Sequence, residues 1–444
     1  MTGYALLKVT ALLAALGLSV LASLVLRRQP ASRRWALAVL GFLPFAGLHA
    51  FSISFLVNDW YRGDSAGLEF TAIDCIVLAL WLALPGGRPG PFRAVRWLYF
   101  TAVLLALPFA PVPLYSLFSV WKLLRMFALV TVVARACEDV DAPPVLLRGI
   151  GLGALFQGLL ALDQHFRLHR YQAVGAFDHQ NTLGMACTLV APISLAIVLA
   201  RPGRRLAWAA LGGGLLAVLL SLSRGSLVMI LVALAAVFCA SAARELTWRK
   251  VGLGAGALLA AAGVALRVWN TWSDRFLNAP KASAEGRVLF ERAASMMADD
   301  HPLGLGLNQF SWALEHLGYA QRAGITGYDT RAVVHNIYWL TAAELGWPGL
   351  AAYLLLLAAP LWMAASAGLR AKGDLRGDVL LGCAAGLLAT YLHGTLEWVA
   401  RQTAFAYLFW TLAALVAALA HQLREEHAVP SRRAVLLHGD LNRA

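Results

Sequence analysis

Residues 269–338 read WNTWSDRFLNAPKASAEGRVLFERAASMMADDHPLGLGLNQFSWALEHLGYAQRAGITGYDTRAVVHNIY. This is the one long polar interval in a sequence that otherwise consists mostly of apolar runs. The interval is rich in arginine and ends in His335-Asn336-Ile337-Tyr338, where the next apolar run begins. A segment with several arginines that leads into a histidine beside an apolar helix indicates anion binding close to a site of proton transfer.

The composition indicates a membrane protein. The chain has 444 residues, of which 60% are hydrophobic and only 14% are charged, whereas soluble domains carry about 25% charged residues. Many of its apolar runs reach the roughly 20 residues that cross a bilayer. We therefore expect an all-α, polytopic fold of about 12 transmembrane helices, from thirteen runs at 4–26, 35–57, 70–85, 97–113, 118–136, 146–162, 182–200, 207–222, 226–243, 251–268, 335–368, 378–397 and 402–421. The first run is followed by Arg27-Arg28 instead of a cleavage site, and we expect a retained helix.

The net charge of +13 would suggest nucleic-acid binding in a soluble protein. Here the excess of Lys and Arg falls in alternate short gaps between the apolar runs, where it sets topology. No nucleic-acid partner is therefore expected, and the basic gaps are predicted to be cytoplasmic. The outward gaps are then 58–69, 163–181, 222–225, 269–334 and 398–401.

Three regions follow from this topology: N-terminal transmembrane helices at 1–268, an outward loop at 269–334, and C-terminal transmembrane helices with a cytoplasmic tail at 335–444. Within the loop, Ser283 is predicted to cap a helix over 284–299. Asn308 is predicted to cap a second helix that Gly318 ends. Gly346-Trp347-Pro348-Gly349 predicts a kink in the apolar run at 335–368.

Four polar motifs fall in the outward gaps. They are GAFDHQN at 175–181, SLSRG at 221–225, Gly286-Arg287 with HPLGLG at 301–306, and HNIY at 335–338 with ELGWPGL at 344–350. Their order and spacing resemble the O-antigen ligase and polymerase superfamily of bacterial envelopes. The resemblance covers about 170–350, and the N-terminal half matches only as helices of the right kind.

The resemblance implies a GT-C-like fold in the bacterial inner membrane, with a partly helical periplasmic loop. It implies transfer of a glycan from undecaprenyl diphosphate to an acceptor hydroxyl, which in the ligases belongs to lipid A-core, without a cofactor. The essential arginine and histidine of the family match Arg224 and His335, and a further loop arginine matches Arg287. Membrane lipids surround such a protein.

Arg224 suits a diphosphate leaving group, because a guanidinium binds such oxygens in a bidentate manner and stays charged. Stabilisation of developing charge is usually the largest catalytic contribution, and a helix start adds positive potential. The alternative is an interfacial arginine that extends to lipid headgroups. We favour that alternative for Arg62 and Arg401.

His335 suits a general base, since imidazole titrates near neutrality. Tyr338, three residues later, is predicted to share a helix face with it, and Asn336 lies between them as a further substrate-binding candidate. Without the resemblance, a histidine that caps a helix is the more natural interpretation.

Other candidates remain open between two interpretations. His179 and Asn181 either bind phosphate or sugar, or cap the helix at 182–200. Lys122 and Arg125 lie inside an apolar run, where cations are costly and usually functional. They either bind the diphosphate or pair with a carbonyl or an acidic neighbour.

No metal is expected. Asp139-Val-Asp141 matches the Asp-x-Asp pattern of metal-dependent glycosyltransferases, but it falls in a predicted cytoplasmic gap and suits a solvated loop. His165 and His169 have a spacing that suits zinc, but the sequence offers no evident third ligand. The arginines are expected to take the role of the metal.

The leading hypothesis is an O-antigen ligase that works by one displacement, with inversion at the anomeric carbon. The nearest alternative is an O-antigen or cell-surface polysaccharide polymerase, followed by a protein O-oligosaccharyltransferase. A lipid or glycan transporter would be expected to show internal repeats and helices broken at the midplane. The gathering of polar motifs on one face favours an enzyme.

Overall fold

Each of the thirteen apolar runs contains a helix. The computed structural model describes residues 3–57, 63–87, 89–277, 281–326 and 329–441. Within these ranges, nine helices are long and apolar enough to cross a membrane, which confirms an all-α, polytopic membrane protein. The helices that correspond to the runs are α1 (Gly3–Arg28), α2 (Pro30–Phe42), α3 (Ala72–Ala83), α4 (Arg93–Ala106), α5 (Pro113–Ala136), α6 (Ala142–Leu162), α7 (Gln180–Ala200), α8 (Arg205–Ser221), α9 (Arg224–Arg244), α10 (Trp248–Leu277), α14 (Ile337–Arg370), α15 (Leu375–His393) and α16 (Thr403–Leu441).

Four of the runs form helices shorter than the prediction of about 12 spans requires. α2, α3, α4 and α8 have 12 to 17 residues, and at 1.5 Å per residue the shortest reach only about 18 Å. The run at 35–57 is broken because Pro44 and Gly47 lead into short 3-10 turns. The chain then forms β1 (Ser52–Phe55), which pairs antiparallel with β2 (Leu68–Thr71) in a hairpin that we did not predict.

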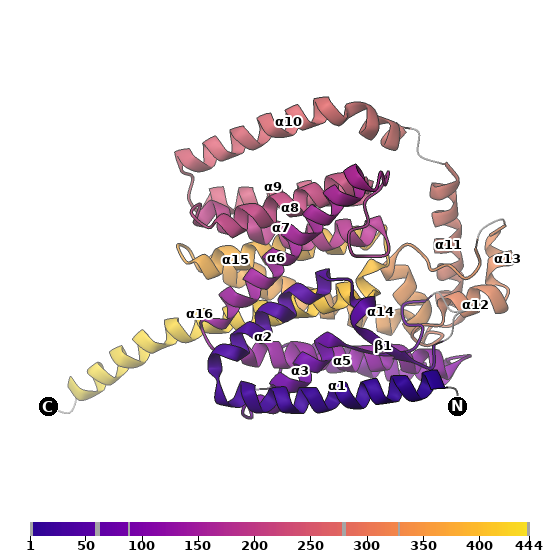
Figure 1. The fold of residues 1–444 in the computed structure, drawn as a ribbon, viewed down its shortest axis with the longest axis horizontal. Helices are drawn as coiled ribbons and strands as arrows, with labels where there is room; N and C mark the ends of the chain where they lie inside the picture. The colour runs from indigo at the N-terminus through magenta and orange to yellow at the C-terminus, as the bar shows by residue number, and fades with distance from the viewer. Residues whose placement is uncertain (1–2, 58–62, 88, 278–280, 327–328, 442–444) are drawn as a thin grey trace.

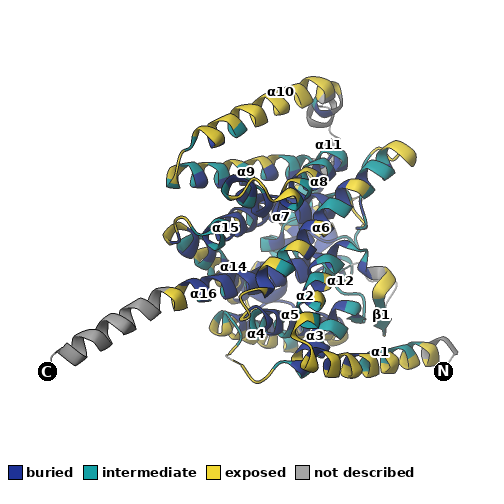
Figure 2. Cartoon of the chain, turned by 60° about the vertical axis from the view of Figure 1, so that its left-hand side comes forward, coloured by how far each residue is buried: buried dark blue, intermediate teal, exposed yellow. Residues whose placement is uncertain are grey.

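The helices lie mostly side by side, with α1, α3 and α5 toward one edge and α9 and α10 toward the other (Figure 1). α7 packs against α8, α9 and α15 and is largely buried, whereas α10 is exposed along nearly its whole length (Figure 2). The outward loop forms α11 (Lys281–Asp300), α12 (Phe310–His316) and α13 (Tyr319–Ala323) at one end of the bundle. A separate core beneath these three helices includes Phe290, Met297 and Phe310, so the loop is a packed unit.

The two caps predicted for the loop are wrong. α11 already begins at Lys281, so Ser283 lies inside it. Asn308 has a left-handed backbone (φ 67°), and its amide donates to the carbonyls of Ser65 and Tyr115. It therefore ties the loop to the N-terminal half, and α12 begins after Gln309. Gly318 directly follows Leu317, the C-cap residue of α12, and has a left-handed backbone (φ 77°), so the predicted end of this helix is confirmed.

The predicted kink in α14 is confirmed. Gly346 has φ 67° and ψ −176°, which interrupts the helix. A Cβ at this position would lie 2.1 Å from the carbonyl oxygen of Pro302, so only glycine fits. Trp347 donates its backbone N–H to the same carbonyl, at 3.2 Å. The kink thus joins α14 to the loop.

Candidate functional site

A polar cavity of about 460 Å³ lies where the ends of α7, α9 and α15 meet α11 and the start of α14. We call it the Arg224 cavity. It is lined by three of the predicted catalytic residues and two of the predicted binding residues, namely Arg224, Arg287, His335, His179 and Asn181. These residues come from all four sequence motifs and span more than 150 positions of the chain. Glu397 and His393, which were not predicted, also line the cavity.

Arg224 is the first residue of α9, as expected. α8 ends at Ser221, and its C-cap residue Leu222 has a left-handed backbone (φ 50°). The Ser223 hydroxyl then caps α9 by accepting the N–H of Ser226 at 3.4 Å. The next residue is Gly225. A side chain does not fit at this position, because a Cβ there would lie 2.6 Å from Nε2 of the buried His393. The SLSRG motif therefore places a guanidinium at the positive end of a helix dipole, close against α15.

His335 is held by a buried carboxylate. Its Nδ1 lies 3.0 Å from Oε2 of Glu397, whose side chain is only 4% exposed. An ionised carboxylate can only accept a hydrogen bond, so Nδ1 carries the proton. In the neutral imidazole, Nε2 then has a free lone pair. The ring is therefore in the tautomer that a general base requires.

Glu397 also joins Arg287 and Asn181. Its Oε1 accepts from Arg287 at 3.0 Å and from the Asn181 amide at 2.6 Å. Burial raises the pKa of Glu397, but the hydrogen bond from His335 and the positive charges of His335 and Arg287 outweigh burial, so the pKa lies below its ordinary value. Glu397 is therefore charged at neutral pH and connects α7, α11 and the start of α14.

His179 serves as a helix cap and also faces the cavity. Its Nδ1 accepts the backbone N–H of Asn181 at 3.2 Å, at the start of α7. Burial lowers the pKa of His179, and the charge of His335 lowers it further, against an opposing effect of Glu397. A neutral His179 whose Nδ1 accepts must carry its proton on Nε2. Both interpretations of this residue are thus compatible.

Asn336 and Tyr338 lie outside the Arg224 cavity. The Asn336 side chain caps α14 by accepting from the N–H groups of Tyr338 and Trp339, and its amide donates to Glu291. The helix therefore begins after His335, and the prediction that His335 and Tyr338 share a helix face is wrong. The Tyr338 hydroxyl donates to the carbonyl of Tyr391 at 2.7 Å.

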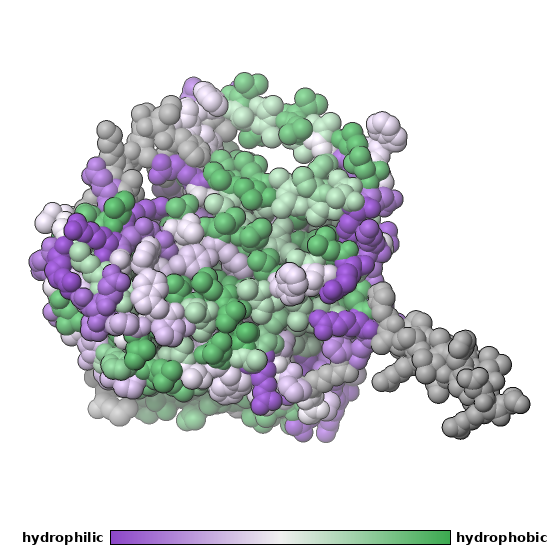
Figure 3. Space-filling model, turned by 180° about the vertical axis from the view of Figure 1, so that it is seen from behind, coloured by the Kyte–Doolittle hydropathy of each residue, from purple (hydrophilic) through white to green (hydrophobic). Residues whose placement is uncertain are grey.

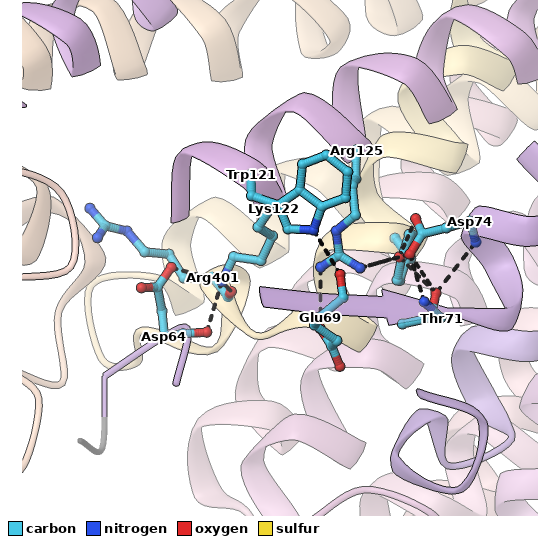
Figure 4. Close-up of polar contacts among 9 residues, drawn as sticks. Asp64, Glu69, Thr71, Asp74, Trp121, Lys122, Arg125 and Arg401 are labelled. Carbon is cyan, nitrogen blue, oxygen red and sulfur yellow. Dashed lines mark hydrogen bonds and ion pairs between the residues drawn. The ribbon is translucent and has the colours of Figure 1, made fainter. Parts of the chain in front are cut away.

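Lys122 and Arg125 of α5 are both paired with carboxylates (Figure 4). The Lys122 ammonium lies 2.8 Å from Asp64 and also donates to the carbonyl of Arg401. Arg125 lies 2.8 Å from Asp74 and 3.2 Å from Glu69. Neither cation lines the Arg224 cavity, so the structure shows the pairing that was the alternative for both.

Arg401 is not an interfacial arginine, and that prediction is wrong. Its side chain is 8% exposed and forms an ion pair with the equally buried Glu344. Its second nitrogen donates to the Thr341 hydroxyl. Glu344 also accepts the backbone N–H of Phe310, so this pair connects the segment between α15 and α16 to α14 and the loop. Arg62 lies outside the described residues.

The two candidate metal sites do not gather ligands. Asp139 and Asp141 both pair with Arg34, at 3.0 and 2.9 Å. His165 contacts the carbonyl of Arg170. In the described part of the chain, no three His, Cys, Asp or Glu side chains are placed to hold one metal ion.

One stretch of the chain matches a known family. Residues 209–354 match the family model described as O-antigen ligase. No curated protein matches the sequence. The matched segment contains Arg224, Arg287 and His335, whereas His179, Asn181 and Glu397 lie outside it. The chain is thus a multi-pass membrane protein in which residues 209–354 are similar to the O-antigen ligase family.

Proposed function

We propose that this chain is an O-antigen ligase, because residues 209–354 match the family model of that description. It transfers a glycan from undecaprenyl diphosphate to a sugar hydroxyl of lipid A-core. The observation that carries this proposal is the Arg224 cavity, in which two guanidinium groups lie beside a histidine held by a carboxylate. Anion binding and proton transfer are the two tasks that this reaction requires.

The cavity faces the periplasm of the inner membrane in this proposal. α9 begins at the cavity with Arg224 and ends at Arg244, within one of the basic gaps. Two other basic gaps, at 201–205 and 370–376, follow α7 and α14, whose first turns lie near the cavity. The positive-inside rule favours a cytoplasmic location for such gaps, so the cavity lies on the opposite face.

The donor diphosphate lies against Arg224 and Arg287. As the bond between the anomeric carbon and the diphosphate oxygen breaks, negative charge grows on the departing oxygen. Two guanidinium groups stabilise that charge through fixed N–H donors. Glu397 neutralises part of the cation charge before the substrate enters and holds Arg287 in place.

The acceptor hydroxyl approaches Nε2 of His335. Its oxygen forms the new bond to the anomeric carbon, its proton passes to Nε2, and the diphosphate leaves with the bonding electron pair. Glu397 stabilises the imidazolium that results, through the hydrogen bond at Nδ1. A single displacement of this kind inverts the configuration at the anomeric carbon.

The test is reconstitution of the purified chain with an undecaprenyl-diphosphate glycan. Lipid A-core and a second molecule of the lipid-linked glycan are offered as competing acceptors. We expect glycosylated lipid A-core with inverted linkage, read by mass spectrometry and NMR. A longer lipid-linked glycan instead would identify a polymerase, and retained configuration would contradict the single displacement.

A further inference from the structure

A second polar cavity, also of about 460 Å³, lies at the other end of α9 from the Arg224 cavity. We call it the Arg249 cavity. It is formed by the last turns of α7 and α9, the first turn of α10 and the turn that joins α14 to α15. The 21 residues of α9 separate the two cavities by about 30 Å. Five basic side chains and two carboxylates line it: Arg201, Arg244, Arg249, Lys250, Lys372, Glu245 and Asp378.

The inner side chains of this cavity hold its shape. Arg244 pairs with Asp378 at 2.8 Å and also donates to the carbonyl of Ala371. The buried Lys250 donates to the carbonyls of Ser241 and Glu245, at 3.0 and 2.7 Å. These bonds tie the start of α10 to the end of α9 and the end of α9 to the turn before α15. The base of the cavity is thus built from fixed cations.

The three exposed cations at the rim of the Arg249 cavity account for its excess of basic over acidic side chains. Arg201, Arg249 and Lys372 are exposed. One nitrogen of Arg249 donates to the carbonyl of Leu199 at 2.7 Å. Within the described ranges, neither Arg201 nor Lys372 has a carboxylate partner. A phosphate group would therefore meet three cations at the mouth of the cavity.

The surface beside the rim is apolar. Trp248 opens α10 with 89% of its surface exposed, and Leu258 and Leu259 farther along are 74% and 75% exposed. α10 stands apart from the bundle in both ribbon views, and its contacts to α9 are few (Figures 1 and 2). Seen from behind, the surfaces of this helix and its neighbours are largely hydrophobic (Figure 3). Tryptophan at such a position is typical of a membrane interface.

We propose that the Arg249 cavity binds the headgroup of an anionic phospholipid, with its acyl chains along the exposed faces of α9 and α10. Arginine and lysine bind phosphate through charge-assisted hydrogen bonds. Basic pockets between helices on the cytoplasmic side are suited to anionic headgroups. A zwitterionic lipid brings its own ammonium group, which the surplus of cations repels. The apolar faces distinguish a lipid from a soluble phosphate.

Native mass spectrometry of the full chain in detergent tests this proposal. The protein is titrated with phosphatidylglycerol and, separately, with phosphatidylcholine of the same acyl chains. We expect preferential retention of phosphatidylglycerol. In a variant with Arg201→Gln, Arg249→Gln and Lys372→Gln, we expect about a hundredfold weaker retention of that lipid, because each of the three interfacial cations contributes to the attraction.

The matched control is Arg28→Gln, which removes an exposed charge in another basic gap, at the end of α1. It should bind phosphatidylglycerol like the unaltered chain. Equal retention of both lipids, or unchanged retention in the triple variant with normal folding by circular dichroism, would overturn the proposal. Displacement of the lipid by inorganic phosphate at similar concentrations would assign the cavity to a soluble anion instead. None of these outcomes depends on transferase activity.

Discussion

The imidazole of His335 and the carboxylate of Glu397 are 62 positions apart in the sequence and 3.0 Å apart in the structure. Glu397 lies in the turn after α15, and His335 lies just before α14. The same carboxylate contacts Arg287 and Asn181. One buried side chain therefore sets the positions of a proposed base and a proposed phosphate ligand.

Replacing His335 with alanine is expected to lower kcat by about 10²–10⁴-fold, the usual contribution of a general base. The protein should still insert and purify, because the Asn336 side chain caps α14. His421→Ala is the matched control, since this histidine lies on α16, outside the Arg224 cavity, and pairs with the exposed Glu425. Transfer of labelled glycan measures the effect. Full transfer by the His335 variant would remove this residue as the base.

Glu397→Gln should keep the shape of the side chain but remove its charge. We expect kcat to fall by about 10²-fold, because the imidazolium loses its counter-charge. The acid limb of the pH profile of kcat/KM should move to lower pH. Glu397→Asp, which keeps the charge on a shorter side chain, should recover part of the activity. An unchanged pH profile in Glu397→Gln would reduce this residue to a structural role.

Glu397 also predicts how stability depends on pH. Its pKa in the folded protein lies below the ordinary value of 4.5, so folding favours the charged form. The stabilisation is present above that ordinary pKa and is lost as the pH falls through the lowered pKa. The difference in thermal midpoint between the unaltered chain and Glu397→Gln should therefore be larger at pH 7 than at pH 3. The same difference in thermal midpoint at both pH values would contradict the prediction that folding favours the charged form of this carboxylate.

Arg287 and Arg292 form a matched pair on α11. Arg287 contacts Glu397 inside the Arg224 cavity, whereas Arg292 is exposed. Arg287→Lys is expected to reduce kcat by about 10²–10³-fold, because an ammonium cannot present a guanidinium's two parallel donors. Arg292→Lys should have little effect. Equal rates for both variants, measured with the same lipid-linked donor, would exclude Arg287 from the site.

Arg401→Gln is expected to destabilise the protein by about 3–5 kcal/mol, since it leaves Glu344 buried without its partner. Arg376→Gln is the control, because its ion pairs are more exposed and such pairs contribute about 0–1 kcal/mol. The thermal unfolding midpoints of the two variants, measured in detergent, compare these losses of stability. The double variant Arg401→Met with Glu344→Gln should recover part of the loss. A stable Arg401→Gln variant would show that this pair does not hold the loop to the bundle.

Local patterns determined which segments are helical and where the four polar motifs lie. Ser223 and Arg224 illustrate this, because a cap and the first residue of a helix are neighbours in the chain. The sequence motifs and the family resemblance also identified Arg224 and His335 as candidates. Glu397 was missed because it closes an apolar run, where no local signal separates a buried acid from an interfacial one. Its proximity to His179 and Asn181 depends on the packing of α7 against α15.

By itself, the sequence determined the membrane class of the protein, the order of its helices and the position of the long polar loop among them. These properties follow from runs of residues that are neighbours along the chain. Only the tertiary structure decided where each charge lies: Lys122, Arg125 and Arg401 are paired with carboxylates away from the Arg224 cavity, whereas Arg224 and Arg287, the latter paired with Glu397, line that cavity. The physical reason is that ion pairing depends on distances of a few ångströms between residues far apart in the chain, and only the packing of helices sets such distances.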